Sequence, residues 1–224
     1  MPNLSTASWP SPPGVRTLLS GPESKAMTHF LRSRHDAILV GVGTAVADDP
    51  GLNCRLEQHA QQHHHHHHPQ PVVVDPTARW AVSEESKVVQ LAREGVGGRY
   101  IPVPVKAWGE TRAEAEDAKR ASLAWESVVA VLRAEGVESL MVEGGGRVIN
   151  DLLELSNNGV DVVDSVIVTV APVWLGSGGV TVSPDRPVDG QGNGRPGPRL
   201  GDVRWVQMGE DMVLCGKVAR QVLS

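Results

Sequence analysis

The segment from Met141 to Leu153 constrains the fold most, because it reads as an apolar strand that ends in Glu143, then three glycines, then a helix. Glycine has no Cβ, so backbone N–H groups in such a turn can approach a ligand closely. The unpaired N–H groups of a helix start also favour an anion. The layout therefore predicts a site for the phosphates of a nucleotide cofactor, with plain turn chemistry as the alternative.

Apolar runs rich in β-branched residues predict strands that alternate with helical patterns. The predicted strands are Asp36–Thr44, Pro71–Asp75, the Met141 strand, Asp164–Ala171, a weak edge strand Tyr100–Val105, and a closing antiparallel pair, Arg204–Met208 and Met212–Val218. One predicted helix has Ser20 at its N-cap, Pro22 in its first turn and an apolar face through Arg34. Another spans Glu114–Glu135 and is closed by Gly136.

This alternation predicts an α/β fold with a mostly parallel central sheet and antiparallel strands at the C-terminus. Ligands of such sheets bind outside the carboxyl ends of the strands. Thr44, Asp48, Asp75 and the segment Glu143–Gly146 are therefore expected in one neighbourhood. This convergence favours an enzyme that uses a nucleotide cofactor.

The 224 residues contain no Pro/Ser linker that would divide them, so residues 16–224 are expected to form a single domain after an irregular arm at 1–15. A His-rich loop is expected at 58–70 and a Gly/Pro-rich loop at 176–201. The six consecutive histidines at 63–68 are interpreted as a low-complexity surface loop or a tag, because a flexible loop makes a poor specific metal site. No metal site is predicted.

Charge and cysteine content narrow the classes of function. A net charge of −5 without a Lys/Arg cluster argues against a nucleic-acid partner. The two cysteines, Cys54 and Cys215, provide no disulfide framework and suit a reducing compartment. No apolar run approaches the roughly 18 residues of a membrane span, so we expect no membrane partner and a cytoplasmic location.

Residues Arg32–Arg55, with the pattern Thr-x-x-x-Asp-Asp-Pro-x-Leu-x-x-Arg, closely resemble the pyrimidine reductases of riboflavin biosynthesis. The segments Val142–Ile149 and Val166–Gly179 agree in the same order. The resemblance implies a three-layer dihydrofolate-reductase-like fold, a homodimer and NADPH as cofactor. In the fungal branch, which the match resembles, the enzyme reduces the ribosyl group of 2,5-diamino-6-ribosylamino-4(3H)-pyrimidinone 5′-phosphate. The zinc deaminase signature of bifunctional relatives is absent from the sequence.

The resemblance also assigns roles to single residues. Gly145–Asp151 is similar to the segment that holds the NADPH phosphates on a helix start, and the implied cofactor contacts are Thr44, Asp48, Gly144, Gly145, Gly146, Arg147 and Val148. The implied substrate contacts are Arg32, Leu52, Arg55 and Glu143, with an arginine fork suited to the 5′-phosphate. Glu143 is also the candidate catalytic residue for proton movement, and Arg79 the candidate cation for the 2′-phosphate of NADPH.

Each of these residues has a simpler structural alternative. Thr44 can merely end a strand, Asp48-Asp49-Pro50 can be only an Asx turn, and Arg79 can be a surface residue. Family members also begin with a strand of the type Leu-Thr-x-Ala-x-Ser-Leu-Asp-Gly, which the prolines after Trp9 prevent here, so a first strand is expected to be missing. That departure keeps two other functions open: an impaired homologue that binds nucleotide or a partner, and a reductase of another substrate.

Overall fold

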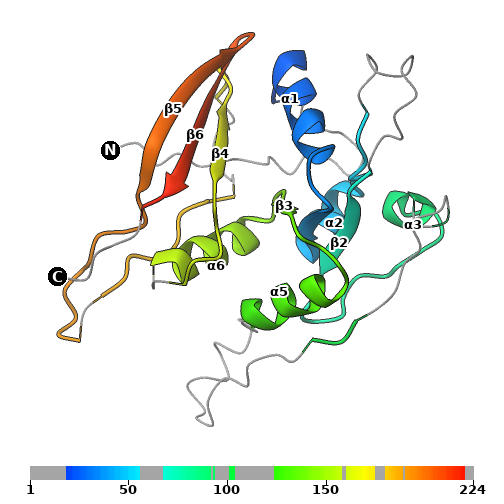
Figure 1. Ribbon diagram of the computed structural model, residues 1–224, viewed down its shortest axis with the longest axis horizontal. Coiled ribbons are helices and arrows are strands. Elements are labelled where there is room, and N and C mark those ends of the chain that lie inside the picture. Colours follow the sequence, from blue (N-terminus) through cyan, green and yellow to red (C-terminus); the bar gives the residue numbers. More distant parts are fainter. Residues whose placement is uncertain are drawn as a thin grey trace. The chain divides into compact units, whose positions relative to one another are not determined.

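A computed structural model describes residues 19–55, 68–91, 93, 101–103, 124–157, 160–174, 180–188 and 190–219 of the chain (Figure 1). These residues form two compact units. One unit combines the residues up to Phe30 with those from Gly144 onward, and the other is the continuous segment Leu31–Glu143. The predicted N-terminal arm, the expected loss of the first strand and histidines 63–67 lie outside the described residues.

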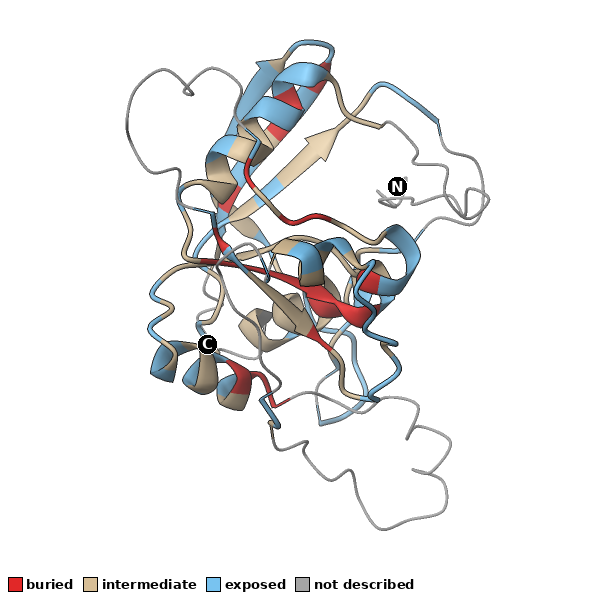
Figure 2. Ribbon diagram, turned by 90° about the vertical axis from the view of Figure 1, so that its right-hand side faces the viewer, coloured by how far each residue is buried: buried red, intermediate tan, exposed pale blue. Residues whose placement is uncertain are grey.

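The segment Leu31–Glu143 is built on a parallel sheet of three strands in the order β2-β1-β3. Its strands are β1 (Ala37–Gly41), β2 (Gln70–Val74) and β3 (Leu140–Val142). Ala37 is in register with Gln70 on one side and with Leu140 on the other. All five residues of β1 are buried, as the continuous apolar run predicts for a central strand (Figure 2). The prediction of parallel strands is confirmed, and full burial is confirmed for β1, whereas β2 is buried only at Val74 and β3 is partly exposed throughout.

The helices described in this unit are α2 (Val42–Asp48), α3 (Lys87–Leu91) and α5 (Trp125–Ala134). Helix α5 ends as predicted, because Gly136 adopts a φ of +83° and Val137 N–H donates to the carbonyl of Leu132 at 3.0 Å. This is the Schellman arrangement, in which a left-handed glycine satisfies the last carbonyls of a helix. The part of the predicted helix between residues 114 and 123 lies outside the described residues.

Two strand predictions are wrong in this unit. The strand expected up to Thr44 ends at Gly41, and Thr44 lies in helix α2 instead. The reason is tertiary: Ala45 on α2 is buried in the core, and Asp49 closes the helix in a left-handed conformation by donating its N–H to the Ala45 carbonyl at 3.2 Å. A short apolar run does not distinguish these outcomes. Residues 101–103 of the expected edge strand are not part of a strand either.

The other unit contains most of α1 (Pro22–Arg32), α6 (Gly146–Asn157) and an antiparallel sheet in the order β4-β6-β5 (Figure 1). Its strands are β4 (Val166–Val170), β5 (Leu200–Met208) and β6 (Asp211–Val218). The closing antiparallel pair is therefore confirmed, although β5 begins four residues earlier than predicted, before a shift in register between Gly201 and Arg204. The preceding Gly/Pro-rich loop carries one isolated bridge, Val188 to Gly194.

Helix α1 begins differently from the prediction. The carbonyl of Gly21 accepts the first helical hydrogen bond, from Lys25 N–H at 3.1 Å, so Gly21 rather than Ser20 is the N-cap. Pro22 takes the first helical position, where its missing N–H costs nothing. The capping carboxylate comes from far along the chain, because Asp211 Oδ2 accepts a hydrogen bond from Gly21 N–H at 2.8 Å. Asp211 is 2% exposed, so β6 supplies a buried cap that local sequence spacing does not reveal.

Candidate functional site

The three parallel strands end at one edge of their sheet, and the candidate residues of this unit follow those ends. Thr44, Asp75 and Glu143 come after β1, β2 and β3, respectively. Glu143 remains tied to the sheet, because its N–H donates to the carbonyl of Leu39 at 2.9 Å. The parallel register brings Asp75 and Glu143, which follow β2 and β3 directly, to the same edge of the sheet, whereas Thr44 lies further on, in helix α2. That these residues share one neighbourhood with Asp48 and Gly144–Gly146 stays a prediction.

The charged centre of this edge is an ion pair between Arg32 and Glu143. Arg32 Nε donates to Oε1 at 2.7 Å, and Arg32 Nη2 donates to Oε2 at 2.5 Å, so the contact is bidentate. The two side chains are 13% and 21% exposed. Two parallel charge-assisted hydrogen bonds in a largely buried place fix the orientation of the Glu143 carboxylate.

The third donor group of Arg32 is also occupied, because Nη1 donates to the backbone carbonyl of Asn53 at 3.0 Å. The Arg32 guanidinium therefore binds both the Glu143 carboxylate and the Asn53 carbonyl, so its paired N–H groups are not both available to a ligand. Arg32 holds Glu143 in this structure, and its contact with the substrate stays a prediction.

Leu52 has a packing role. It is 1% exposed and forms a core cluster with Ile38, Val40 and Ala45, against which Trp80 packs. Its φ of +52° is left-handed, a conformation that strains residues with a Cβ. The core holds this strained backbone in place, and the residue as a whole is shielded from solvent. Its substrate contact stays a prediction.

Asn53 belongs to the site although sequence reasoning missed it. Its carbonyl binds Arg32, and its side-chain Oδ1 accepts a hydrogen bond from Arg55 Nε at 3.1 Å. Asn53 thus contacts both arginines that the resemblance assigns to the substrate. It is not one of the residues that define the motif, so the sequence analysis did not assign it a role.

Helix α2 carries Thr44, half-buried, and Asp48, exposed, one turn apart on the same side. The Arg79 guanidinium lies over this helix, since a Cβ on Gly43 would be 3.6 Å from Arg79 Nη2. Asp75 shapes the turn that carries Arg79, because its Oδ2 accepts from Trp80 N–H at 2.8 Å. Asp75 therefore has the structural role of a turn residue, and Arg79 is placed beside the predicted cofactor contacts of α2.

The glycine segment belongs to the other unit and is described by itself. Gly144 and Gly145 have φ values of +84° and +80°, and the Gly145 carbonyl accepts from Ile149 N–H at 3.1 Å as the N-cap of α6. A Cβ on Gly146 would lie 2.2 Å from Val180 Cγ1. Arg147 is exposed, whereas Val148 is 6% exposed and packs in the core.

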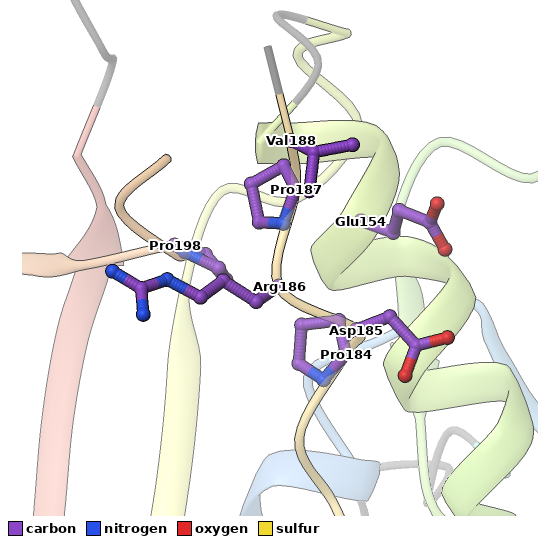
Figure 3. Close-up of a pocket in the computed structure, with 7 residues that line it drawn as sticks. All are labelled: Glu154, Pro184, Asp185, Arg186, Pro187, Val188 and Pro198. Carbon is purple, nitrogen blue, oxygen red and sulfur yellow. The ribbon is translucent and has the colours of Figure 1, made fainter. Parts of the chain in front are cut away.

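A pocket of about 320 Å³ lies elsewhere in this unit, between α6 and the segment Pro184–Val188 (Figure 3). It is lined by Glu154, Pro184, Asp185, Arg186, Pro187, Val188 and Pro198, none of which the sequence analysis assigns to a site. Among the described residues, no group of three or more His, Cys, Asp or Glu side chains is arranged to hold a metal ion. Within the same part of the chain, no helix is both long and apolar enough to cross a membrane.

Comparisons with known proteins agree on one family. Residues 8–214 match the RibD C-terminal domain. The chain is 38% identical over 215 residues to the 2,5-diamino-6-ribosylamino-4(3H)-pyrimidinone 5′-phosphate reductase of Candida glabrata, covering 92% of this chain and 82% of the relative. The enzyme of that name from Saccharomyces cerevisiae is 36% identical, with 92% and 80% covered. Among solved structures, the riboflavin biosynthesis reductase Rib7 of Saccharomyces cerevisiae superposes with a TM-score of 0.66 at 31% identity, covering 88% of this chain and 82% of that one.

Proposed function

The chain belongs to the RibD C-terminal domain family, and from this membership and its site we propose that it is a pyrimidine reductase of riboflavin biosynthesis. Its substrate would be 2,5-diamino-6-ribosylamino-4(3H)-pyrimidinone 5′-phosphate, the compound in the names of its fungal relatives. The α/β fold is that of RibD-type reductases, which is dihydrofolate-reductase-like.

One observation carries the proposal. The carboxylate of Glu143 is held by two hydrogen bonds from Arg32 at the carboxyl edge of a parallel sheet. In the sequence, the next residues are the left-handed glycines that open α6. A reductase must orient a polar substrate against a phosphorylated cofactor. An oriented carboxylate can hold the substrate, and a glycine turn at a helix start, whose backbone N–H groups are accessible, can hold the cofactor's phosphates.

A nicotinamide cofactor fits the residues present. Gly144 and Gly145 adopt a backbone that a Cβ would strain, and they lead into a helix of 12 residues. We propose that the cofactor is NADPH, with its phosphates on residues 144–148 and further contacts at Thr44 and Asp48. When bound, the nicotinamide would supply a hydride to C1′ of the opened sugar.

The chain's own residues would bind, orient and move protons. Glu143 would accept a hydrogen bond from a sugar hydroxyl or relay a proton at the ring oxygen as the ring opens. Arg32 would keep the Glu143 carboxylate turned to that position through its two bonds. Arg55, which is exposed, would attract the 5′-phosphate.

We further propose that the protein is a homodimer located in the cytoplasm. Apolar side chains on one face of the antiparallel sheet support self-association, since Trp205 is 58% exposed and Met212, which the register places on the same face, is 38% exposed. Light scattering behind size exclusion would give the mass, and a monomer at micromolar concentration would contradict the dimer.

The decisive experiment is oxidation of NADPH by the purified protein, with and without the diaminopyrimidine ribose phosphate, and with NADH in parallel. We expect loss of NADPH that depends on the substrate. A folded protein that binds NADPH without turnover would instead be an impaired homologue or a reductase of another substrate, and a substrate screen would separate these two.

A further inference from the structure

We propose that Asn53 is a positioning residue that aims the Arg55 guanidinium at the phosphate end of the substrate. The inference rests on the proposed function, because it assigns a subsite of the same site. It adds a residue that neither the motif nor the family comparison marks.

The contact that carries the inference is between two side chains. Arg55 Nε donates to Asn53 Oδ1 at 3.1 Å. An arginine side chain has several rotatable bonds, and a bond at Nε fixes the plane of the guanidinium while its terminal nitrogens point away from that bond. Arg55 is exposed, so its guanidinium is accessible to an anionic ligand.

Gly51 provides the space for this arrangement. A Cβ at Gly51 would lie 2.9 Å from Asn53 Oδ1 and 3.3 Å from Arg55 Nη2. The amide of Asn53 and the guanidinium of Arg55 therefore both pack on the bare backbone of Gly51. A side chain at position 51 would therefore clash with the Asn53 amide and crowd the Arg55 guanidinium.

The backbone that carries Asn53 is fixed from two sides. Leu52, the preceding residue, is anchored in the core with a left-handed φ of +52°, and the Asn53 carbonyl is bound by Arg32 Nη1 at 3.0 Å. Because Arg32 uses the backbone of Asn53, a change of the Asn53 side chain removes the contact with Arg55 and leaves the Arg32–Glu143 pair intact. Asn53 thus contacts both arginines of the site: its backbone binds Arg32, which holds the Glu143 carboxylate, and its side chain binds Arg55, which is proposed to bind the substrate phosphate.

The test is a double-mutant cycle with Asn53→Ala and Arg55→Gln, read by calorimetric titration of ribose 5-phosphate, with ribose as the phosphate-free arm. Asn53→Ala frees the Arg55 side chain, and the cost of ordering one such side chain on binding predicts about a 3- to 10-fold weaker affinity for ribose 5-phosphate. In the Arg55→Gln background, the same change should have no further effect, because Asn53 acts through Arg55. Gln90→Ala, which removes another exposed amide side chain of this unit, is the matched control and should bind as the wild type does.

Turnover gives a second readout. Asn53→Ala should raise KM for the pyrimidine substrate with kcat unchanged, since the phosphate contact is made equally in the ground and transition states. An equal loss of ribose 5-phosphate affinity in both backgrounds, no loss in either, or no binding by the wild type would overturn the inference. If the wild type does not turn over the pyrimidine but the cycle behaves as described, the proposed function fails and the phosphate subsite stands.

Discussion

Arg32 and Glu143 are 111 residues apart in the sequence, yet they form a bidentate ion pair with N–O distances of 2.7 and 2.5 Å. The resemblance assigns both residues to the substrate, and the structure joins them to each other. Arg32 therefore holds the Glu143 carboxylate in one orientation.

Arg32→Lys tests this orientation through stability. A lysine ammonium replaces two parallel hydrogen bonds by one at best, so we expect a loss of about 1–3 kcal/mol in the free energy of unfolding, measured with urea. Arg93→Lys is the control, because the Arg93–Glu84 pair is 58% and 76% exposed and should contribute about 0–1 kcal/mol. Equal losses in the two variants would contradict a special role for the Arg32 pair.

Glu143→Gln tests the role in proton movement. The amide keeps the shape of the side chain but cannot take up a proton, so we expect kcat to fall by about 10²- to 10⁴-fold. Cofactor affinity, followed by quenching of protein fluorescence on titration with NADPH, should change little. Turnover at the wild-type rate would remove Glu143 from the chemistry.

Gly145→Ala tests the cofactor cradle. The φ of +80° costs a residue with a Cβ about 1–2 kcal/mol, and the distorted turn should also weaken NADPH binding. Gly136→Ala is a close control, because Gly136 has a φ of +83° and a methyl group added there would meet no described atom within 4 Å. Calorimetry should show similar losses of stability in both variants and a loss of NADPH affinity in Gly145→Ala alone.

Arg79→Gln tests recognition of the 2′-phosphate. Removal of a charged hydrogen-bond donor should weaken NADPH by about 10- to 100-fold and leave NADH unchanged. The ratio of the two dissociation constants, measured by fluorescence titration, is the readout. A parallel loss for both cofactors would show that Arg79 serves the fold or another part of the ligand.

Leu52→Ala tests the anchor of the loop. Truncation of a leucine that is 1% exposed should lower the free energy of unfolding by about 2–5 kcal/mol. Leu52→Met nearly conserves volume and should lose less than about 1.5 kcal/mol in the same urea titration. An exposed, uncoupled Leu52 would instead give two variants that unfold like the wild type.

Local pattern predicts the parts of the fold that depend on local chemistry. The strands β1, β2, β4 and β6 follow apolar, β-branched runs, and Gly136 closes α5 for a reason visible in the sequence. The same pattern wrongly extends β1 to Thr44, because Val42-Gly43-Thr44 continues an apolar run, and only the burial of Ala45 in the core shows why a helix forms there.

The sequence predicts the members of the site but not their contacts. Arg32, Glu143 and Arg55 are assigned through the motif, whereas no spacing reveals that Arg32 binds Glu143 or that Asn53 contacts both arginines. These contacts depend on the conformation of the loop at Leu52, which is set by packing of the Leu52 side chain in the core. The start of β5 at Leu200 is likewise not visible in the sequence, because Gly201 and Asp202, which has a φ of +50°, interrupt the apolar strand pattern.

The cap of α1 by Asp211 has a consequence for the order of events during synthesis on the ribosome. Gly21 leaves the ribosome early, but the carboxylate that satisfies its N–H lies 190 residues further along. The segment Leu31–Glu143 is complete before that carboxylate exists. During synthesis, α1 therefore lacks this cap while the middle of the chain can already fold. A nascent chain halted before Asp211 should be more readily cleaved by proteases at α1.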